Sequence, residues 1–234
     1  MLKIAIETGL LEIEIHDFRK YAEGKHMQAD DGPYGGGPGM VLMLQPIVDA
    51  LEGLIDKRIK EGFERSRLIL LTPEGRTFDQ GIACELGREE HIILVSGHYE
   101  GFDARLTKLF PFEEISVGDY ILSGGEAAAL VIIESVAREI PGVLGNPESL
   151  ESESFRSGLL DYPSYTRPPE FRGLKVPDVL LGGNHKLIAE WRLRESIKKT
   201  IKKRPDLLEK SDLDKTKRKI VDEIKAELDL ENKT

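Results

Sequence analysis

The sequence predicts an α/β domain with a parallel sheet, followed by a small all-helical domain. Residues 68–71 and 92–95 are short, wholly apolar runs, as expected of strands that are buried on both faces. Between them, residues 77–88 have a helical pattern with Asp79 in the first turn. A strand, a helix and a strand within about thirty residues are typical of a βαβ unit, whose two strands are parallel.

The other elements are predicted from the period of the apolar residues. Residues 11–15 alternate apolar and acidic side chains at the strand period, after a short helical turn. Residues 41–60 repeat apolar side chains at helical spacing. Residues 115–122 contain a strand end, and residues 125–139 form a strongly apolar helix.

The amino-acid composition of the chain changes after this helix. Prolines, serines and acidic residues then follow without clean periodicity, which is typical of a linker. From His185 onward the sequence is charged and helical, with Trp191, Leu193 and Ile197 marking an inner face. We therefore expect an α/β domain over residues 1–145, a linker over 146–160 and a helical domain over 161–234.

Composition narrows the class of protein. The 234 residues are 40% hydrophobic, which fits a globular protein with a real core. No apolar run approaches the roughly 18 residues of a membrane span, and the first residues lack the pattern of a signal peptide. A single cysteine, Cys84, cannot form an internal disulfide. These observations predict a cytoplasmic protein without a membrane segment.

Charge is unevenly distributed along the chain. The formal net charge of −9 argues against a nucleic-acid partner when it is taken as an average. Between His185 and Pro205, however, eight lysines and arginines stand against two glutamates. Because local charge matters more than total charge for docking, this basic cluster is compatible with RNA binding. It also has an ordinary alternative, a solvated helix face whose long side chains cover apolar surface.

Residues 30–40 contain five glycines and two prolines, which excludes a helix or a central strand. The stretch is flanked by globular sequence, so it predicts a shaped binding loop. Residues 71–75, 97–103 and 116–126 are three further polar, glycine-containing loops at predicted strand ends, where parallel sheets bind ligands. The sequence contains neither the phosphate-binding P-loop motif nor the G-x-G-x-x-G motif of dinucleotide-binding folds. This pattern suits an adenosine-like cofactor such as S-adenosylmethionine, although spacing alone does not establish it.

Six stretches in order carry a resemblance to a known family. They are D-x-P-Y-G-G-G-P-G-M at 31–40, G-x-Y-E-G at 97–101, G-D-Y-x-L-x-G-G-E at 118–126, I-P-G-V-L-G at 140–145, G-L-L-x-x-P-x-Y-T-R-P at 158–168, and W-R at 191–192 with R-P-x-L-L at 204–208. Together they resemble the bacterial tRNA (guanine-N1)-methyltransferases, which belong to the knotted SPOUT superfamily. The resemblance covers residues 2–209.

The resemblance implies a deep trefoil knot in the α/β domain and a homodimer whose active sites lie at the subunit interface. It implies methyl transfer from S-adenosylmethionine to N1 of the guanine immediately 3′ of the anticodon (position 37) in tRNA. The implied cofactor residues are Leu71, Thr72, Gly97, Tyr99, Glu100, Val117, Gly118, Asp119, Tyr120, Ile121, Leu122, Gly124 and Gly125. The implied substrate residues are Tyr34, Gly35, Gly36, Gly37, Pro38 and Gly39 over the guanine, with Arg167, Lys198, Lys199 and Arg204 on the tRNA.

The chemistry needs a base for the N1 proton and a cation for the charge on O6. The resemblance implies Arg138 as the cation and Glu153 as the base, where the family has an aspartate. Arg138 has the alternative of an ordinary cation at a helix C-terminus. No histidines have the spacing of metal ligands, so we expect no resident metal, whereas Mg²⁺ near Asp30, Asp31 and Glu153 during catalysis is compatible with the resemblance.

Some features depart from the family or leave alternatives open. The family has an additional strand before the segment that matches Leu2, and Met1 falls inside the expected first helix. His98 stands at a variable position and is expected to be a solvated loop residue. Two other functions fit the same motifs, namely a knotted methyltransferase acting on a different RNA position and a non-catalytic RNA-binding homologue.

Overall fold

A computed structural model describes residues 1–144, 153–210 and 213–231 of the chain. The chain divides into two compact units, Met1–Gly145 and Asn146–Thr234. The first unit has its apolar core on both sides of a sheet, and the second has a core of its own between helices. In the described part of the chain, no helix is long and apolar enough to cross a membrane.

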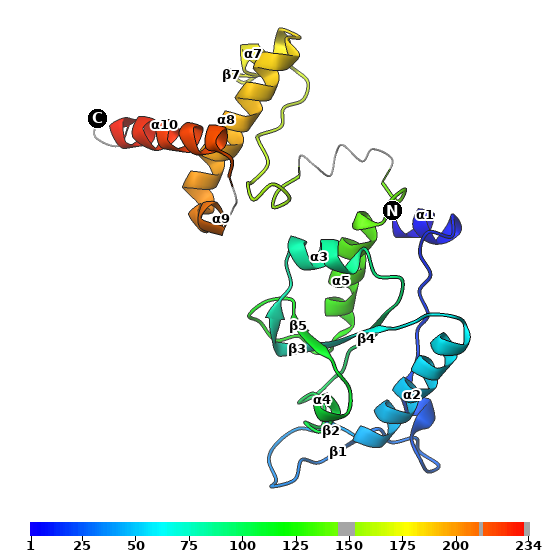
Figure 1. The fold of residues 1–234 in the computed structure, drawn as a ribbon. Coiled ribbons are helices and arrows are strands. Elements are labelled where there is room, and N and C mark those ends of the chain that lie inside the picture. Colours follow the sequence, from blue (N-terminus) through cyan, green and yellow to red (C-terminus); the bar gives the residue numbers. More distant parts are fainter. Residues whose placement is uncertain (145–152, 211–212, 232–234) are drawn as a thin grey trace. The chain divides into compact units, whose positions relative to one another are not determined.

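The sheet of the first unit has three parallel strands in the order β4-β3-β5 (Figure 1). They are β3 (Arg67–Thr77), β4 (Ile92–Val95) and β5 (Glu113–Ser116). Helix α3 (Gln80–Leu86) connects β3 to β4, and α4 (Leu106–Leu109) connects β4 to β5. The predicted parallel α/β class and the two apolar strands are therefore confirmed.

Helices cover both faces of this sheet, which explains why residues 68–71 of β3 and all four residues of β4 are apolar. Leu68 and Leu70 of β3 pack in one cluster with residues of α2 (Leu44–Lys60) and α4, whereas Ile69 and Leu71 pack in another with α3 and α5 (Glu126–Glu139). Successive side chains of a strand point to opposite faces, so a strand between two helical layers needs apolar residues at every position.

Strand β3 is longer than predicted, because residues 71–75 belong to it instead of forming a loop at its end. Leu71 and Arg76 both lie opposite Ile115 of β5, so the four residues between them are an insertion in the pairing. Gly75 is needed there, since a Cβ atom on it would clash with the backbone carbon of Glu114. Pro73 and Gly75, which suggest a turn in the sequence, lie in this bulge instead. Bulges are places where proline and glycine occur within strands.

Helix boundaries also shift from the predicted ones. Residues 77–79 precede α3, because Thr77 still pairs with Ser116 and the Asp79 carboxylate caps the helix by accepting from the Ile82 backbone N–H at 3.0 Å. The predicted helix over 41–60 begins with a short strand, β2 (Val41–Leu42), before α2. The predicted helix over 125–139 is confirmed as α5.

Residues 11–15 do not form the strand that their alternation predicts. They follow α1 (Leu2–Glu7) and precede the 3₁₀ helix η1 (Phe18–Tyr21) as extended chain. Ile15 is 94% exposed, so the apolar residues of the segment do not all face a core. The segment is held instead by Glu14, whose carboxylate lies 3.0 Å from the Lys57 ammonium and 3.3 Å from the Arg58 guanidinium on α2.

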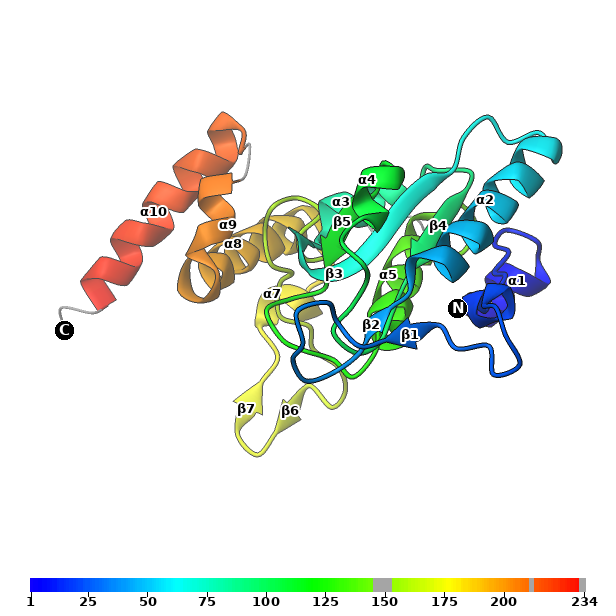
Figure 2. The ribbon, with the colours of Figure 1, turned by 90° about the horizontal axis from the view of Figure 1, so that it is seen from below.

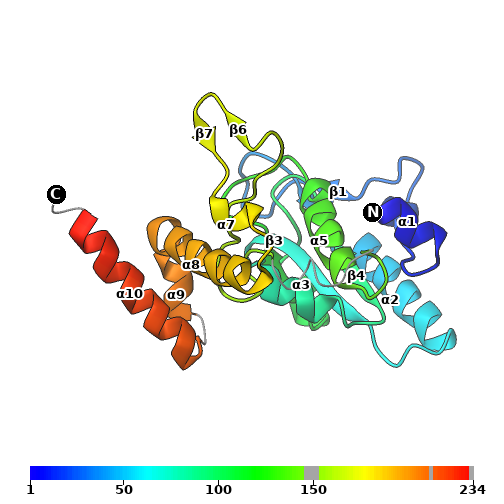
Figure 3. The ribbon, with the colours of Figure 1, turned by 90° about the horizontal axis from the view of Figure 1, so that it is seen from above.

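The second unit contains the helices α7 (Asp178–Leu181), α8 (His185–Lys203), α9 (Pro205–Lys210) and α10 (Lys215–Glu231). Ile197 of α8 packs with Val221, Ile224 and Leu228 of α10, and these two helices lie side by side in Figures 1 and 3. The sequence predicts only helices here, yet a hairpin is also present (Figure 2). Its strands are β6 (Glu170–Phe171) and β7 (Leu174–Lys175), whose two-residue length gives no readable periodicity.

The attachment of residues 11–15 to α2 should depend on pH. The hydrogen bond from Lys57, with that from His16, lowers the pKa of Glu14 to about 2. The stabilisation it contributes is therefore complete above about pH 4.5, the ordinary pKa of a glutamate, and is lost as the pH falls toward 2. We expect Glu14→Gln to lower the free energy of unfolding at pH 6 and to make little difference at pH 2.5. Denaturant titrations over this range check the prediction, with Glu12→Gln as the control, and a deficit independent of pH would contradict it.

Candidate active site

The glycine-rich loop is the turn of a small hairpin in the first unit. Its strands β1 (Asp30–Asp31) and β2 are antiparallel, with Asp31 opposite Val41. Four glycines of the loop have positive φ angles, and they are Gly35, Gly36, Gly37 and Gly39. Side chains with a Cβ atom rarely adopt this conformation, so the glycines are required by the path of the backbone. Tyr34 is fully exposed at the start of the turn.

This hairpin is attached to the loop that follows β4. The Leu42 N–H donates to the Gly101 carbonyl at 2.9 Å, and the Glu100 N–H donates to the Met40 carbonyl at 3.0 Å. Gly39 lies directly against the Glu100 side chain, since a Cβ atom on Gly39 would clash with Oε1 of that glutamate. The structure therefore brings together the predicted substrate loop and one predicted cofactor loop.

The loop after β4 is also attached to the loop after β5. The Gly125 N–H donates to the Gly97 carbonyl at 2.8 Å, and His98 forms an antiparallel bridge with Gly124. A Cβ atom on Gly125 would lie 2.6 Å from Cβ of Ser96, so the two loops touch closely. Three separate segments thus meet at the carboxyl edge of the parallel sheet, where such sheets bind ligands.

His98 is an exposed loop residue, as expected, and it also has a partner. Its Nε2 lies 2.6 Å from Oε1 of Glu126, the first residue of α5. This hydrogen bond lowers the pKa of the Glu126 carboxyl. Both side chains are substantially exposed, so the pair contributes at most about 1 kcal/mol to holding the loops together.

A paired carboxylate lies at the far end of the loop after β4. Asp103 accepts from the Arg105 backbone N–H at 2.9 Å and pairs with its guanidinium at 2.6 Å. The Arg105 guanidinium holds the pKa of Asp103 at about 2, so this carboxylate is charged at neutral pH. The Asp103 N–H also donates to the Leu42 carbonyl at 3.3 Å, so the loop is attached at both of its ends, to Gly125 through Gly97 and to Leu42 through Asp103.

Exposed aromatic and apolar side chains surround these backbone contacts. Tyr99 has a positive φ of 60° and an exposed ring, and Tyr120 is exposed in the loop after β5. Val117 accepts a hydrogen bond from the Tyr120 hydroxyl at 3.2 Å, and Ile121 beside it is 81% exposed. Exposed rings next to bare backbone can bind a flat heteroaromatic group by stacking and by main-chain hydrogen bonds.

Leu71 and Thr72 are placed differently from the other predicted cofactor residues. Leu71 is buried in the core beneath α3 and α5, and Thr72 begins the insertion in β3, where its hydroxyl accepts from the Glu74 N–H at 3.3 Å. The Leu71 side chain therefore serves packing.

The two predicted catalytic residues lie in different units. Arg138 is in the last turn of α5, in the first unit. Glu153 lies in the second unit, on the wall of a cavity of about 170 Å³ that Asp161, Arg192 and Lys217 also line. Within its own unit, Glu153 thus lines a cavity together with two cations and a second carboxylate. Among the described residues, no group of three or more metal-ligating side chains could hold a metal ion.

Several cations of the basic cluster already have intramolecular partners. Lys199 donates to the Asp161 carbonyl at 2.9 Å, and Arg204 pairs with Asp206 at 2.7 Å. Arg194 pairs with Glu227 at 2.7 Å. The two carboxylate partners offset the charges of Arg194 and Arg204, so a count of lysines and arginines along the sequence overestimates the charge that the cluster presents to a ligand.

Two residues of α8 differ from the prediction. The buried polar role of Thr200 was not predicted, and Trp191 does not lie in the predicted core. The fully buried Thr200 accepts from the Leu160 N–H at 2.9 Å and donates to the Ser196 carbonyl, which fixes the segment before the tyrosines to α8. Trp191 lines a pocket with Tyr165 instead of joining the core around Ile197. The W-R motif was the available signal for this pocket.

The contact between the two loops at Gly125 should be sensitive to a single methyl group. Gly125 has an ordinary φ of −84°, so Gly125→Ala adds a clash with Ser96 without backbone strain. We expect a loss of about 1–3 kcal/mol in the free energy of unfolding, measured with denaturant. Gly32→Ala in the glycine-rich loop is the matched control, because a Cβ atom there meets nothing within 4 Å. Equal stability of both variants would show that the loops separate readily.

Comparison with known proteins identifies the family of this chain. Residues 1–210 match the family model of the tRNA (guanine-1)-methyltransferase TrmD. Proteins named tRNA (guanine-N(1)-)-methyltransferase are similar over most of the chain. The one from Limosilactobacillus fermentum is 48% identical over 225 residues, which are 96% of this chain and 88% of the relative. The one from Geobacillus kaustophilus is 54% identical over 209 residues, 89% of this chain and 84% of the relative. The chain therefore belongs to the tRNA (guanine-1)-methyltransferase family.

Proposed function

We propose that this protein transfers a methyl group from S-adenosylmethionine to N1 of the guanine immediately 3′ of the anticodon, at position 37 of tRNA. Membership of its family supports the activity of a tRNA guanine-N1 methyltransferase. The observation that carries the proposal is the meeting of three loops at one edge of the sheet, through Gly39 with Glu100 and through Gly97 with Gly125. A methyl donor and a methyl acceptor must lie next to each other, and this contact joins the two loops assigned to them.

The residues at this edge fit S-adenosylmethionine. The exposed rings of Tyr99 and Tyr120 suit its adenine, and the backbone of residues 97–101 and 117–125 suits the polar edge of that ring. The Glu100 carboxylate suits its hydroxyl or ammonium groups. When bound, this cofactor supplies an electrophilic methyl group. The chain provides binding and orientation through these loops.

The chain's own groups prepare the guanine. The N1 lone pair is delocalised into the ring while N1 carries its proton, so a base is needed. In the proposal, Glu153 accepts that proton and Arg138 stabilises the negative charge that moves to O6. N1 then forms the new bond to the methyl carbon as the carbon–sulfur bond breaks and its electron pair stays on sulfur. Glutamate keeps the base of the family's aspartate on a side chain that is longer by one methylene.

We extend the proposal to the assembly. The first unit would contain the trefoil knot of the superfamily, and two copies would form a homodimer with active sites at the interface. Leu130 and Val131 of α5 and Ile121 of the adjacent loop support this, because all three are exposed although the other side of α5 is buried. The glycine-rich loop and the basic residues Arg167, Lys198, Lys199 and Arg204 would contact tRNA, and the enzyme would act in the cytoplasm. Mg²⁺ would act together with the bound substrates during catalysis.

The proposal is tested by methyl transfer from labelled S-adenosylmethionine to two tRNA transcripts. One has guanine at position 37 preceded by guanine, and in the other adenine replaces the target. We expect the label to enter only the first transcript and to be recovered as 1-methylguanine. Transfer to both transcripts would indicate a different target position. Cofactor binding without any transfer would indicate a non-catalytic homologue.

The role of Glu153 gives a second prediction. Glu153→Gln keeps the shape of the side chain but cannot accept the N1 proton, so we expect kcat to fall by roughly 10²–10⁴. The Kd for S-adenosylmethionine, measured by calorimetry, should change less than twofold. Glu209→Gln, an exposed position on α9, is the matched control and should keep full activity. Undiminished transfer by Glu153→Gln would remove Glu153 from the mechanism.

A further inference from the structure

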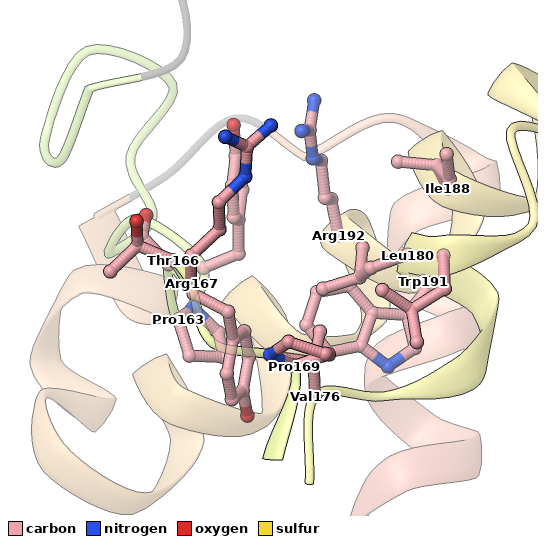
Figure 4. Close-up of a pocket in the computed structure, with 13 residues that line it drawn as sticks. Pro163, Thr166, Arg167, Pro169, Val176, Leu180, Ile188, Trp191 and Arg192 are labelled. Carbon is pink, nitrogen blue, oxygen red and sulfur yellow. The ribbon is translucent and has the colours of Figure 1, made fainter. Parts of the chain in front are cut away.

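The second unit also contains a pocket that is larger than the cavity beside Glu153. It has a volume of about 630 Å³ and is formed by the segment 162–169, by Val176 after the β6–β7 hairpin, and by α7 and α8. Figure 4 shows Trp191, Leu180, Val176 and Pro169 along one side of it. A volume of this size suits a single nucleotide or a molecule of similar size.

The apolar side of the pocket has the composition of a stacking surface. The rings of Trp191 and Tyr165 are in contact, with centroids 6.2 Å apart and an angle of 54° between their planes. Trp191 is partly exposed and Tyr165 is 48% exposed, so both rings are accessible from the pocket. Leu180 and Ile188 extend this surface. Aromatic rings that remain accessible beside aliphatic side chains favour a flat, weakly polar ligand.

Two arginines give the other side of the pocket a positive charge. The side chains of Arg167 and Arg192 project to the same side of the pocket in Figure 4, away from Trp191 and Val176. The Arg192 guanidinium lies 4.7 Å from the centre of the Tyr162 ring, which orients it. None of the thirteen lining residues is acidic, although the whole chain has a net charge of −9. The pocket therefore selects an anionic group next to a flat ring.

We propose that this pocket binds one unstacked nucleotide of the tRNA substrate. The base packs against Trp191 and Tyr165, and the adjacent phosphate pairs with Arg167 and Arg192. The inference deepens the proposed function and rests on it, because it assigns RNA as the occupant. Sequence-tolerant recognition of unpaired RNA commonly combines aromatic stacking with arginine–phosphate contacts, and one stacked base contributes roughly fivefold to 150-fold in affinity.

The experiment uses the fluorescence of Trp191, which is the single tryptophan of the chain. The full-length protein is titrated with an anticodon stem-loop RNA and, separately, with the tRNA. We expect saturable quenching by both RNAs, with an affinity that falls as salt is added. RNA binding is measured in parallel by filter retention. This control distinguishes RNA that binds without changing the tryptophan fluorescence from RNA that does not bind. RNA that binds tightly without changing the fluorescence would overturn the proposal.

Two sets of variants separate the base contact from the phosphate contact. Trp191→Leu should weaken RNA binding at least fivefold, and Trp191→Phe should recover most of the loss, because a ring and not merely bulk is required. The double variant Arg167→Gln/Arg192→Gln should weaken it at least tenfold and reduce the salt dependence. The control Lys215→Gln/Lys225→Gln removes two exposed charges from α10 and should change the affinity less than twofold. Equal losses in the two double variants would overturn the proposal, since they would reflect overall charge.

The outcomes distinguish this proposal from the proposed function. Methyl transfer to tRNA with unchanged RNA affinity in the Trp191 and arginine variants would refute the pocket and leave the function standing. Tryptophan quenching by RNA in a protein that transfers no methyl group would support the pocket and refute the function. Fluorescence that changes with protein concentration and not with RNA would refute the pocket as an RNA site and indicate that a second copy covers it.

Discussion

The parallel pairing of β3 with both β4 and β5 is the constraint on which the rest of the first unit depends. β3 is the central strand, and its alternate side chains join two apolar clusters that lie on opposite faces of the sheet. Parallel strands also end at one edge, so the loops after β4 and β5 emerge side by side. The hydrogen bond from Gly125 to Gly97 and the bridge between His98 and Gly124 join these loops there.

Glycine has a specific part in this arrangement, which differs between positions. Gly35, Gly36 and Gly37 have positive φ angles, and a Cβ atom on any of them would meet nothing within 4 Å, so they define the path of the loop. Gly97 and Gly125 have close neighbours instead, and they allow two segments to touch. The first group shapes the exposed loop, and the second allows the loops at the edge of the sheet to pack against each other.

Charge in the second unit is organised by local pairing. Arg194 and Arg204 have carboxylate partners, whereas Lys199 holds a backbone carbonyl. Arg167 and Arg192 line a pocket that has aromatic rings and no acidic residue in its wall, and Arg192 also lines the neighbouring cavity of Glu153 and Asp161. An acidic protein can in this way present a locally positive, partly apolar surface to RNA, since fields at contact distance exceed the averaged effect of net charge.

The sequence by itself determined the parallel α/β class, the apolar strands β3 and β4 and the helix α5, because doubly buried strands and long helices have strong local patterns. The ordered motifs in the sequence also predicted the family to which the chain belongs. Only the tertiary structure decided that residues 71–75 belong to a bulged strand and that residues 11–15 are not a strand, since pairing depends on a neighbour that local alternation cannot specify. The same reason applies to the sites. The contact of Gly39 with Glu100 and the pocket around Trp191 join residues from separate elements, and only packing brings such residues together.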